Sequence, residues 1–167
     1  MNRNLYVVMG ITGSGKTTVG AMLAHALGVD FVEGDDYHTP ENVQRMASGI
    51  PLTDDDRAGW LQALAARIGE SRDSGRGLVV TCSALKRSYR DVLRTRAPEL
   101  RFIFLNGARA LIAERIAERR GHFMPVSLLE SQLAILEQPA LNEHAWAFDV
   151  EQPAEKIVGD IVTRASE

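Results

Sequence analysis

The sequence predicts a three-layer α/β fold, in which helices cover both faces of a parallel sheet of about five strands. Short apolar runs, typical of strands buried on both faces, alternate with segments of helical periodicity along the 167 residues. No internal repeat and no low-complexity linker interrupts this alternation. We therefore expect one domain over residues 1–167, with ligands bound at the carboxyl ends of the strands.

The expected strands are short, and the first two end in residues that suit a ligand site. The run 5–9 is continuously apolar and is closed by Gly10. The run 30–33 leads into the polar cluster 33–38. The full set of expected strands is 5–9, 30–33, 78–82, 101–105 and 145–150.

The expected helices follow from apolar spacing and from residues suited to helix ends. In 15–27, apolar residues recur at helical spacing and Gly28 is a natural C-terminal cap. Three aspartates at 54–56 suit the start of the next long helix, and 71–77 is rich in turn-forming residues. The expected helices are 15–27, 40–48, 54–71, 86–95, 108–120, 127–137 and a last one opened by Pro153.

Composition limits the classes of partner. The net charge is -3, whereas proteins that bind nucleic acid or membrane surfaces usually carry a basic excess, so we expect neither as a partner. Cys82 is the only cysteine, which excludes an internal disulfide and suits the reducing cytoplasm. Residues 1–9 are too short for a signal peptide, and no apolar run is long enough to span a membrane, so we expect a soluble protein.

A glycine-rich loop lies between the first expected strand and helix. Residues 10–17, GITGSGKT, match the pattern G-x-x-x-x-G-K-[ST] in the strand-to-helix context that its mechanism requires. Backbone N–H groups can then surround phosphate oxygens, Lys16 can reach the β and γ phosphates, and Thr17 can ligate Mg²⁺. The loop predicts binding of ATP with Mg²⁺. The expected nucleotide-binding residues here are Gly10, Thr12, Gly13, Ser14, Gly15, Lys16, Thr17 and Thr18.

The third expected strand favours a small-molecule kinase. A hydrolase or switch GTPase with this loop usually has an aspartate at the end of a hydrophobic strand, where it helps to hold Mg²⁺. Here that strand ends in Val80-Thr81-Cys82-Ser83. The candidates for an acid near Mg²⁺ are then Glu33 and Asp35.

Asp35 is the candidate base. It follows the second strand and Gly34, so we expect it at the cleft formed by the carboxyl ends of the strands. Phosphoryl transfer to a hydroxyl requires a carboxylate that orients the hydroxyl and accepts its proton. The alternative is that the acidic residues of 33–38 belong to a solvated turn.

Two arginine-rich patterns are candidates for binding anions. Lys86, Arg90 and Arg94 recur every four residues on one helix face, and we expect the first two to bind an anionic acceptor. The alternative, which we favour for Arg94, is a solvated face neutralised by neighbouring acids. Arg115 and Arg119 lie at the base of a connection at about 119–126 that resembles a lid, and there they could neutralise the transferred phosphoryl group. The alternative is that Glu114 and Glu118 pair with these arginines on an exposed helix.

Several longer motifs accompany the glycine-rich loop. They are GDDYH at 34–38, 42–46, SGIPLTDDDR at 48–57, Trp60-Leu61, CSALK at 82–86, 89–91, GHFMP at 121–125, 128–129 and Ser131-Gln132. Together they resemble the bacterial gluconokinase family of P-loop sugar-acid kinases, which is related in fold to shikimate and nucleoside monophosphate kinases. The resemblance extends from the glycine-rich loop almost to the end of the chain. The chain departs from the family pattern at Ala58-Gly59, where a proline often precedes the tryptophan.

The resemblance implies ATP-dependent phosphorylation of D-gluconate at its terminal hydroxyl, with Asp35 as the carboxylate facing that hydroxyl and Arg119 as a catalytic lid residue. It further implies that the loop 149–153 packs against adenine and that the enzyme forms a homodimer. The residues matching the acceptor shell are His38, Arg57, Lys86, Arg90 and His122, and those matching the nucleotide site outside the glycine-rich loop are Arg115, Arg119, Gln152 and Pro153.

Two rival functions stay open at this point. The first is a kinase with a different acceptor. The basic groups around Asp35 favour an acidic acceptor, but they do not distinguish gluconate from shikimate or from another small acid. A nucleoside monophosphate is a further possible acceptor. A protein that binds nucleotide for regulation and hydrolyses ATP slowly belongs to a different class. Stimulation of ADP release by an added acceptor separates these alternatives.

Overall fold

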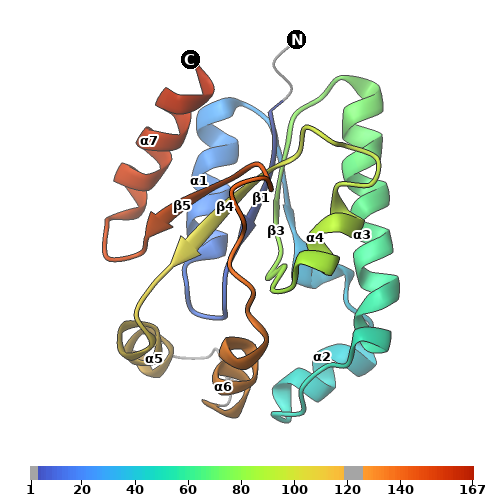
Figure 1. Ribbon diagram of the computed structural model, residues 1–167, viewed down its shortest axis with the longest axis vertical. Helices are drawn as coiled ribbons and strands as arrows, with labels where there is room; N and C mark the ends of the chain where they lie inside the picture. The colour runs from blue at the N-terminus through green and yellow to red at the C-terminus, as the bar shows by residue number, and fades with distance from the viewer. Residues whose placement is uncertain (1–3, 119–125) are drawn as a thin grey trace.

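The sheet of this computed structural model, which describes residues 4–118 and 126–167, has five parallel strands in the order β2-β3-β1-β4-β5 (Figure 1). The two strands nearest the glycine-rich loop, β1 and β3, are hydrogen-bonded neighbours. The predicted parallel α/β sheet is therefore confirmed. The strands are β1 Leu5–Met9, β2 Asp30–Glu33, β3 Leu78–Thr81, β4 Arg101–Asn106 and β5 Ala145–Asp149.

Helices cover both faces of this sheet and form the two outer layers. Figure 1 shows α1 and α7 on one face and α3 and α4 on the other, while α2, α5 and α6 gather near one end of the sheet. The helices are α1 Lys16–Leu27, α2 Pro40–Ala47, α3 Asp54–Ser74, α4 Arg87–Leu93, α5 Arg109–Glu118, α6 Val126–Ile135 and α7 Ala154–Ala165, with a short 3₁₀ helix, η1, at Gly34–Tyr37. Within the described ranges, no helix is both long and apolar enough to cross a membrane.

The central strand β1 shows why these residues form a buried parallel sheet. Successive side chains point to opposite faces, so Val7 contributes to the core beneath α3, whereas Val8 contributes to the core beneath α1 and α7. Both side chains are fully buried. Burial on both faces explains the continuous apolar run, and it fixes the carboxyl end of β1 and the loop that follows it.

The structure differs from the sequence prediction most clearly at α3 and β2, whereas the bounds of the other described elements agree to within about two residues. The helix α3 continues to Ser74 and is ended by Gly75 in a left-handed conformation, with φ of 75°, so the predicted turn-rich link at 71–77 begins later. The strand β2 is half-buried because it lies at the edge of the sheet, whereas the sequence suggested a buried strand.

The start of α3 is capped by the residue that precedes the three aspartates. Thr53 is the N-cap, and it forms a capping box with Asp56, whose N–H donates to the Thr53 hydroxyl while its carboxylate accepts from the Thr53 N–H. The aspartates 54–56 lie in the first turn, as predicted. Because Thr53 and Asp56 complete the cap, Asp54 is available for contacts at the wall of the adjoining cavity.

Candidate active site

The glycine-rich loop connects β1 to α1 in a conformation that suits phosphate binding. Gly13 and Gly15 have φ of 78° and 93°, a left-handed region that favours glycine. A Cβ atom on Gly13 would lie 2.7 Å from Ile116, so α5 packs directly on the loop. The Lys16 ammonium donates to the carbonyl oxygens of Gly10 and Ile11 at 3.0 and 3.1 Å, which holds the loop around the lysine side chain.

A cavity of about 440 Å³ lies between this loop, α5 and the start of α7. The predicted nucleotide residues from three separate parts of the chain meet here. Arg115 donates to the Val150 carbonyl oxygen at 2.7 Å, which ties α5 to the loop after β5. The predicted residues that line this cavity are Gly13, Ser14, Gly15, Thr18, Arg115, Gln152 and Pro153.

The side chain expected to ligate Mg²⁺ lies between the loop and β2. The Thr17 hydroxyl donates to Glu33 Oε2 at 2.8 Å, and Thr81 donates to the other oxygen of the same carboxylate at 2.5 Å. The Thr17 oxygen therefore keeps its lone pairs for a cation, and Glu33 supplies negative charge behind it. These groups fit a Mg²⁺ ion carried by the nucleotide, and they favour Glu33 over Asp35 as the nearby acid.

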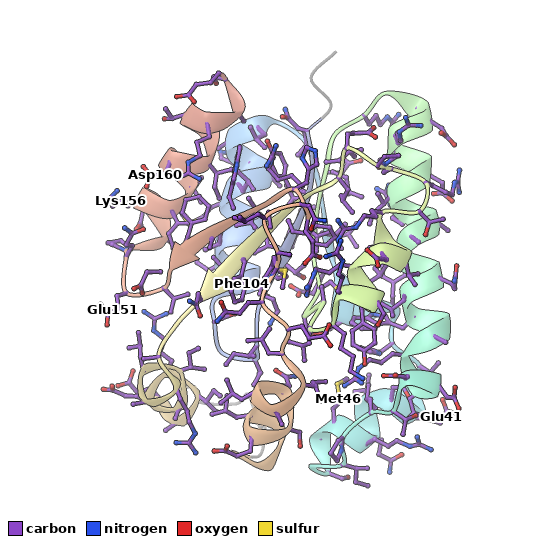
Figure 2. All side chains as sticks on the ribbon, in the orientation of Figure 1. Glu41, Met46, Phe104, Glu151, Lys156 and Asp160 are labelled. Atoms are coloured by element: carbon purple, nitrogen blue, oxygen red, sulfur yellow. The ribbon has the colours of Figure 1, made fainter. Side chains whose placement is uncertain are left out.

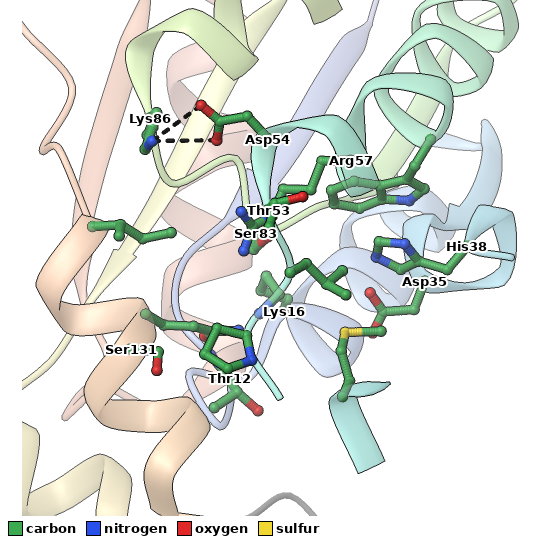
Figure 3. Close-up of a pocket in the computed structure, with 16 residues that line it drawn as sticks. Thr12, Lys16, Asp35, His38, Thr53, Asp54, Arg57, Ser83, Lys86 and Ser131 are labelled. Atoms are coloured by element: carbon green, nitrogen blue, oxygen red, sulfur yellow. Dashed lines mark hydrogen bonds and ion pairs between the residues drawn. The ribbon is translucent and has the colours of Figure 1, made fainter. Parts of the chain in front are cut away.

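A second cavity, of about 350 Å³, is lined by four of the predicted acceptor residues, Asp35, His38, Arg57 and Lys86 (Figure 3). It lies between the glycine-rich loop, η1, the start of α3, the segment before α4, and α6. Lys16 lines this cavity, so the two cavities share the loop. Thr12 and Lys16, predicted for the nucleotide, also line this cavity. Lining residues that were not predicted for the site include Thr53, Asp54, Ser83, Ser131 and Gln132.

Asp35 is positioned by close contacts of the residue before it. A Cβ atom on Gly34 would collide with the Thr81 carbonyl oxygen, so only glycine permits η1 to approach the end of β3 this closely. The Gly34 N–H donates to the Thr81 hydroxyl at 3.1 Å, and the Trp60 indole donates to the Gly34 carbonyl oxygen at 2.8 Å. These contacts hold the exposed Asp35 side chain at the cavity, which Lys16 also lines.

His38 lies against the same tryptophan. Its ring stacks on Trp60 with 4.0 Å between the ring centroids. Burial lowers the pKa of His38, and although Asp35 opposes this shift, Arg57 adds to it. His38 is therefore neutral near pH 7, and it contributes polar surface to the cavity rather than positive charge.

A network of charged groups forms the opposite wall of this cavity. Asp54 accepts from Lys86 at 3.2 Å (Figure 3) and from the Tyr89 hydroxyl at 2.5 Å, while Arg57 donates to the same hydroxyl at 3.0 Å. The hydrogen bond from Tyr89, and then that from Lys86, lowers the pKa of Asp54. The hydrogen bond to Asp54 raises the pKa of Lys86. Two cations and one anion therefore stand at this wall, with a net positive charge.

The structure corrects the prediction for Arg90, which does not line the acceptor cavity. Its side chain is fully buried, and it donates to both carboxylate oxygens of Glu143, at 2.7 and 3.1 Å, and to the Ala84 carbonyl oxygen at 2.8 Å. Arg94, predicted to be solvated, also donates to Glu143, at 3.0 Å. In this structure Arg90 therefore supports the segment that carries Lys86.

We predict that Glu143→Gln lowers the free energy of unfolding by about 3–5 kcal/mol at pH 7, because it leaves Arg90 buried without its counter-charge. Burial raises the pKa of Glu143, but the hydrogen bonds from Arg90 and the Ala140 N–H outweigh that effect, and the pKa falls from 4.5 to about 2. A depressed pKa stabilises the folded state fully above pH 4.5, and this contribution is lost as the pH falls through about 2.

Urea unfolding of the wild type and the variant at several pH values checks this prediction. The difference in free energy of unfolding between the wild type and Glu143→Gln should shrink as the pH falls below 4.5. Asp73→Asn is the matched control, since Asp73 pairs with Arg96 on the surface and should contribute about 1 kcal/mol or less. A variant as stable as the wild type would show that the buried pair does not hold this segment.

Some predicted residues lie outside the two cavities or outside the described part of the chain. Arg119, His122 and the lid expected at about 119–126 fall outside the described residues, except for the start of α6 at its end. Gly10 and Thr17 belong to the glycine-rich loop but line neither of the two cavities. Cys82 lies in the core, where burial raises the pKa of its thiol to about 12.

Comparisons with known proteins agree with this geometry. A family model described as an AAA domain matches residues 5–139. The gluconokinase of Gluconobacter oxydans (strain 621H) is 45% identical over 156 residues, which cover 93% of this chain and 88% of that protein. A solved gluconokinase from Sinorhizobium meliloti 1021 has 50% identity and a TM-score of 0.88, covering 98% of this chain and 91% of that one.

More distant structures show only the shared fold. A shikimate kinase from Aquifex aeolicus vf5 is 19% identical, with a TM-score of 0.58, and covers 96% of this chain and 95% of its own. The likeness to the gluconokinases is far stronger in sequence and extends over nearly the whole chain. The chain belongs to the gluconokinase family and is a P-loop phosphotransferase.

Proposed function

We propose that this enzyme transfers the γ-phosphoryl group of ATP to the terminal hydroxyl of D-gluconate, giving 6-phospho-D-gluconate and ADP. The observation that carries the proposal is the pair of cavities that share the glycine-rich loop. One offers the loop backbone to a nucleotide, and the other presents Lys16 and Asp35 to an acceptor. A phosphoryl group bound at the loop therefore has a hydroxyl-binding cavity beside it.

The larger cavity suits ATP. Its phosphates would lie on the N–H groups of the loop and the N-terminus of α1, and the adenine would lie toward Gln152 and Pro153, which line the same cavity. Arg115 lines this cavity as well and can add positive charge near the phosphates. Thr17 and Glu33 would hold Mg²⁺, which when bound neutralises charge on the phosphates.

In the smaller cavity, Asp35 orients the terminal hydroxyl and takes its proton. A bond forms between that hydroxyl oxygen and the γ-phosphorus, the bond from the γ-phosphorus to the bridging oxygen breaks, and ADP leaves with the bond's electron pair. The proton passes from Asp35 to solvent after transfer. Lys16 reaches the transferring group from the loop and stabilises its negative charge.

The positive wall of this cavity favours an acidic acceptor. Lys86 and Arg57 can meet a carboxylate with charge-assisted hydrogen bonds, while the remaining polar groups can bind hydroxyls. The cavity of about 350 Å³ also suits a small six-carbon acid. Asp54 already neutralises part of the positive charge, so this wall matches an acceptor with a single negative charge better than a nucleoside monophosphate.

Lys86→Ala should raise the KM for gluconate about tenfold and change the KM for ATP little, because it removes one charged donor from the acceptor cavity only. Steady-state kinetics with each substrate varied in turn measure both constants. The matched control is Lys156→Ala, since Lys156 pairs with Asp160 on the exposed side of α7 (Figure 2). An equal rise in both KM values would place Lys86 in the nucleotide site, and an unchanged gluconate KM would remove it from the acceptor site.

The proposal is tested by measuring ADP release from Mg²⁺-ATP with a panel of acceptors. Gluconate should stimulate release strongly, and shikimate, a nucleoside monophosphate and water alone should not. Stimulation of ADP release by shikimate instead of gluconate would show that the enzyme acts on another class of acceptor. Slow release that no acceptor changes would favour a regulatory nucleotide-binding protein.

Several finer expectations remain predictions. These are closure of the segment 119–126 with Arg119 and His122, assembly as a homodimer, and a cytoplasmic location without nucleic-acid or membrane partners. Each follows from the sequence or from the family resemblance.

A further inference from the structure

Gln132 of α6 reaches the glycine-rich loop from the acceptor side. Its Oε1 atom accepts a hydrogen bond from the Thr12 N–H at 2.6 Å, across 120 positions of the chain. The side chain is half-buried and lines the acceptor cavity together with Lys16 and Asp35. Gln132 therefore lies where the phosphate loop meets the acceptor cavity, between the two substrates of the proposed reaction.

This hydrogen bond fixes which end of the amide faces the cavity. A glutamine amide carries its oxygen and its NH₂ group on opposite sides of one carbon, and only the oxygen can accept from the Thr12 N–H. With Oε1 held on the Thr12 N–H, Nε2 points away from that N–H group. Nε2 has no hydrogen-bond partner among the described residues, and its two N–H donors remain for a ligand.

The helix that carries Gln132 is itself fixed to both sides of the site. Leu129 is fully buried in the core. At the other end, the Glu137 N–H donates to the Leu85 carbonyl oxygen at 2.7 Å, and the Glu137 carboxylate accepts from the Arg87 N–H at 2.9 Å. These contacts join α6 to the segment that carries Lys86, so the amide is held in place before any substrate binds.

We propose that Gln132 is a catalytic residue whose Nε2 donates a hydrogen bond to the phosphoryl group as it moves from ATP to the acceptor. The inference rests on the proposed function. In phosphoryl transfer, negative charge spreads over the equatorial oxygens of the transferring group, and a donor already oriented toward that position stabilises it without reorganisation. Because the amide is uncharged, it adds a hydrogen-bond donor to the cavity that Lys16 also lines, and it does not add a further positive charge that would attract the anionic acceptor to the loop.

Two variants test this role. Gln132→Glu keeps the shape of the side chain and an oxygen for Thr12, but it replaces the NH₂ group by a negative oxygen. Gln132→Met keeps the length and removes both polar atoms. We expect kcat to fall about 10²-fold or more in Gln132→Glu and less in Gln132→Met, while the melting temperature and the Kd for ADP change little. Gln138→Glu, an exposed position just beyond α6, is the matched control for added charge.

Binding of ADP with aluminium fluoride and gluconate gives a readout that a structural role would not alter. This mixture imitates the transferring phosphoryl group, so Gln132→Glu should weaken its binding by the same factor as kcat and leave ADP alone unaffected. The inference is overturned if both variants keep the wild-type kcat, or if their defect is confined to ADP affinity or thermal stability. If wild-type enzyme fails to phosphorylate gluconate at all, the proposed function fails first and this inference with it.

Discussion

Lys16→Met is expected to fold normally and to lose activity by about 10²–10³-fold in kcat, the scale for removing a preorganised charge from a transition state. The methionine side chain has a similar length but carries no charge. In the free enzyme Lys16 donates to the carbonyl oxygens of Gly10 and Ile11, and with ATP bound we expect it to reach the β and γ phosphates. Circular dichroism and steady-state kinetics on the purified variant measure the two effects separately.

Lys156→Met is the matched control, because that lysine is exposed on α7 and bonds only to Asp160 one turn away among the described contacts. It should keep wild-type kcat and KM values. If Lys16→Met also kept a near-normal kcat, the loop would not act on the transferred phosphate, and the nucleotide site would have to be assigned elsewhere.

Asp35→Asn is expected to lower kcat by about 10²-fold or more while ATP binding survives. Asparagine keeps the size of the side chain and much of its hydrogen bonding, but it cannot accept the proton of the hydroxyl. Asp35 lines the acceptor cavity and not the nucleotide cavity, so the loss should leave the Kd for ATP unchanged. Steady-state kinetics and nucleotide titration give the two quantities.

Asp35→Ala distinguishes the two roles that a carboxylate can have here. In a loose transition state the proton leaves late, so orientation of the hydroxyl can contribute more than basicity. Asp35→Ala would then be clearly slower than Asp35→Asn, whereas similar rates would indicate that basicity dominates. Asp36→Asn is the neighbouring control and should stay active. Wild-type turnover by Asp35→Asn would show that another acid takes the proton, with Glu33 and Asp36 as the next candidates.

The sequence was sufficient to predict those elements of the fold that local patterns determine. The apolar run of β1, the glycine-rich loop and the helical spacing of α1 are each encoded within a few neighbouring residues, and the structure confirms the elements they predict. The edge position of β2 could not be predicted in this way, because strand order depends on contacts between segments far apart in the chain.

The site was harder to predict for the same reason. Spacing of four placed Lys86 and Arg90 on one helix, but Lys86 lies before α4 and faces the cavity, whereas Arg90 points into the core toward Glu143, 53 positions away. The aspartates at 54–56 were interpreted only as residues that start a helix, so the contact of Asp54 with Lys86 was not predicted. For Gln132 the family motif gave a signal, but its contact with Thr12 depends on the packing of α6.

The phosphoryl group is proposed to pass from ATP to the terminal hydroxyl of gluconate. A time course of the reaction followed by ³¹P nuclear magnetic resonance tests this transfer most directly. The account predicts a new phosphomonoester signal that the methylene protons of the terminal carbon split into a triplet, growing as the β signal of ADP appears. A doublet would place the phosphate on an internal hydroxyl, and inorganic phosphate without any phosphomonoester would mean that water is the acceptor. Either result would contradict the assignment of the acceptor cavity.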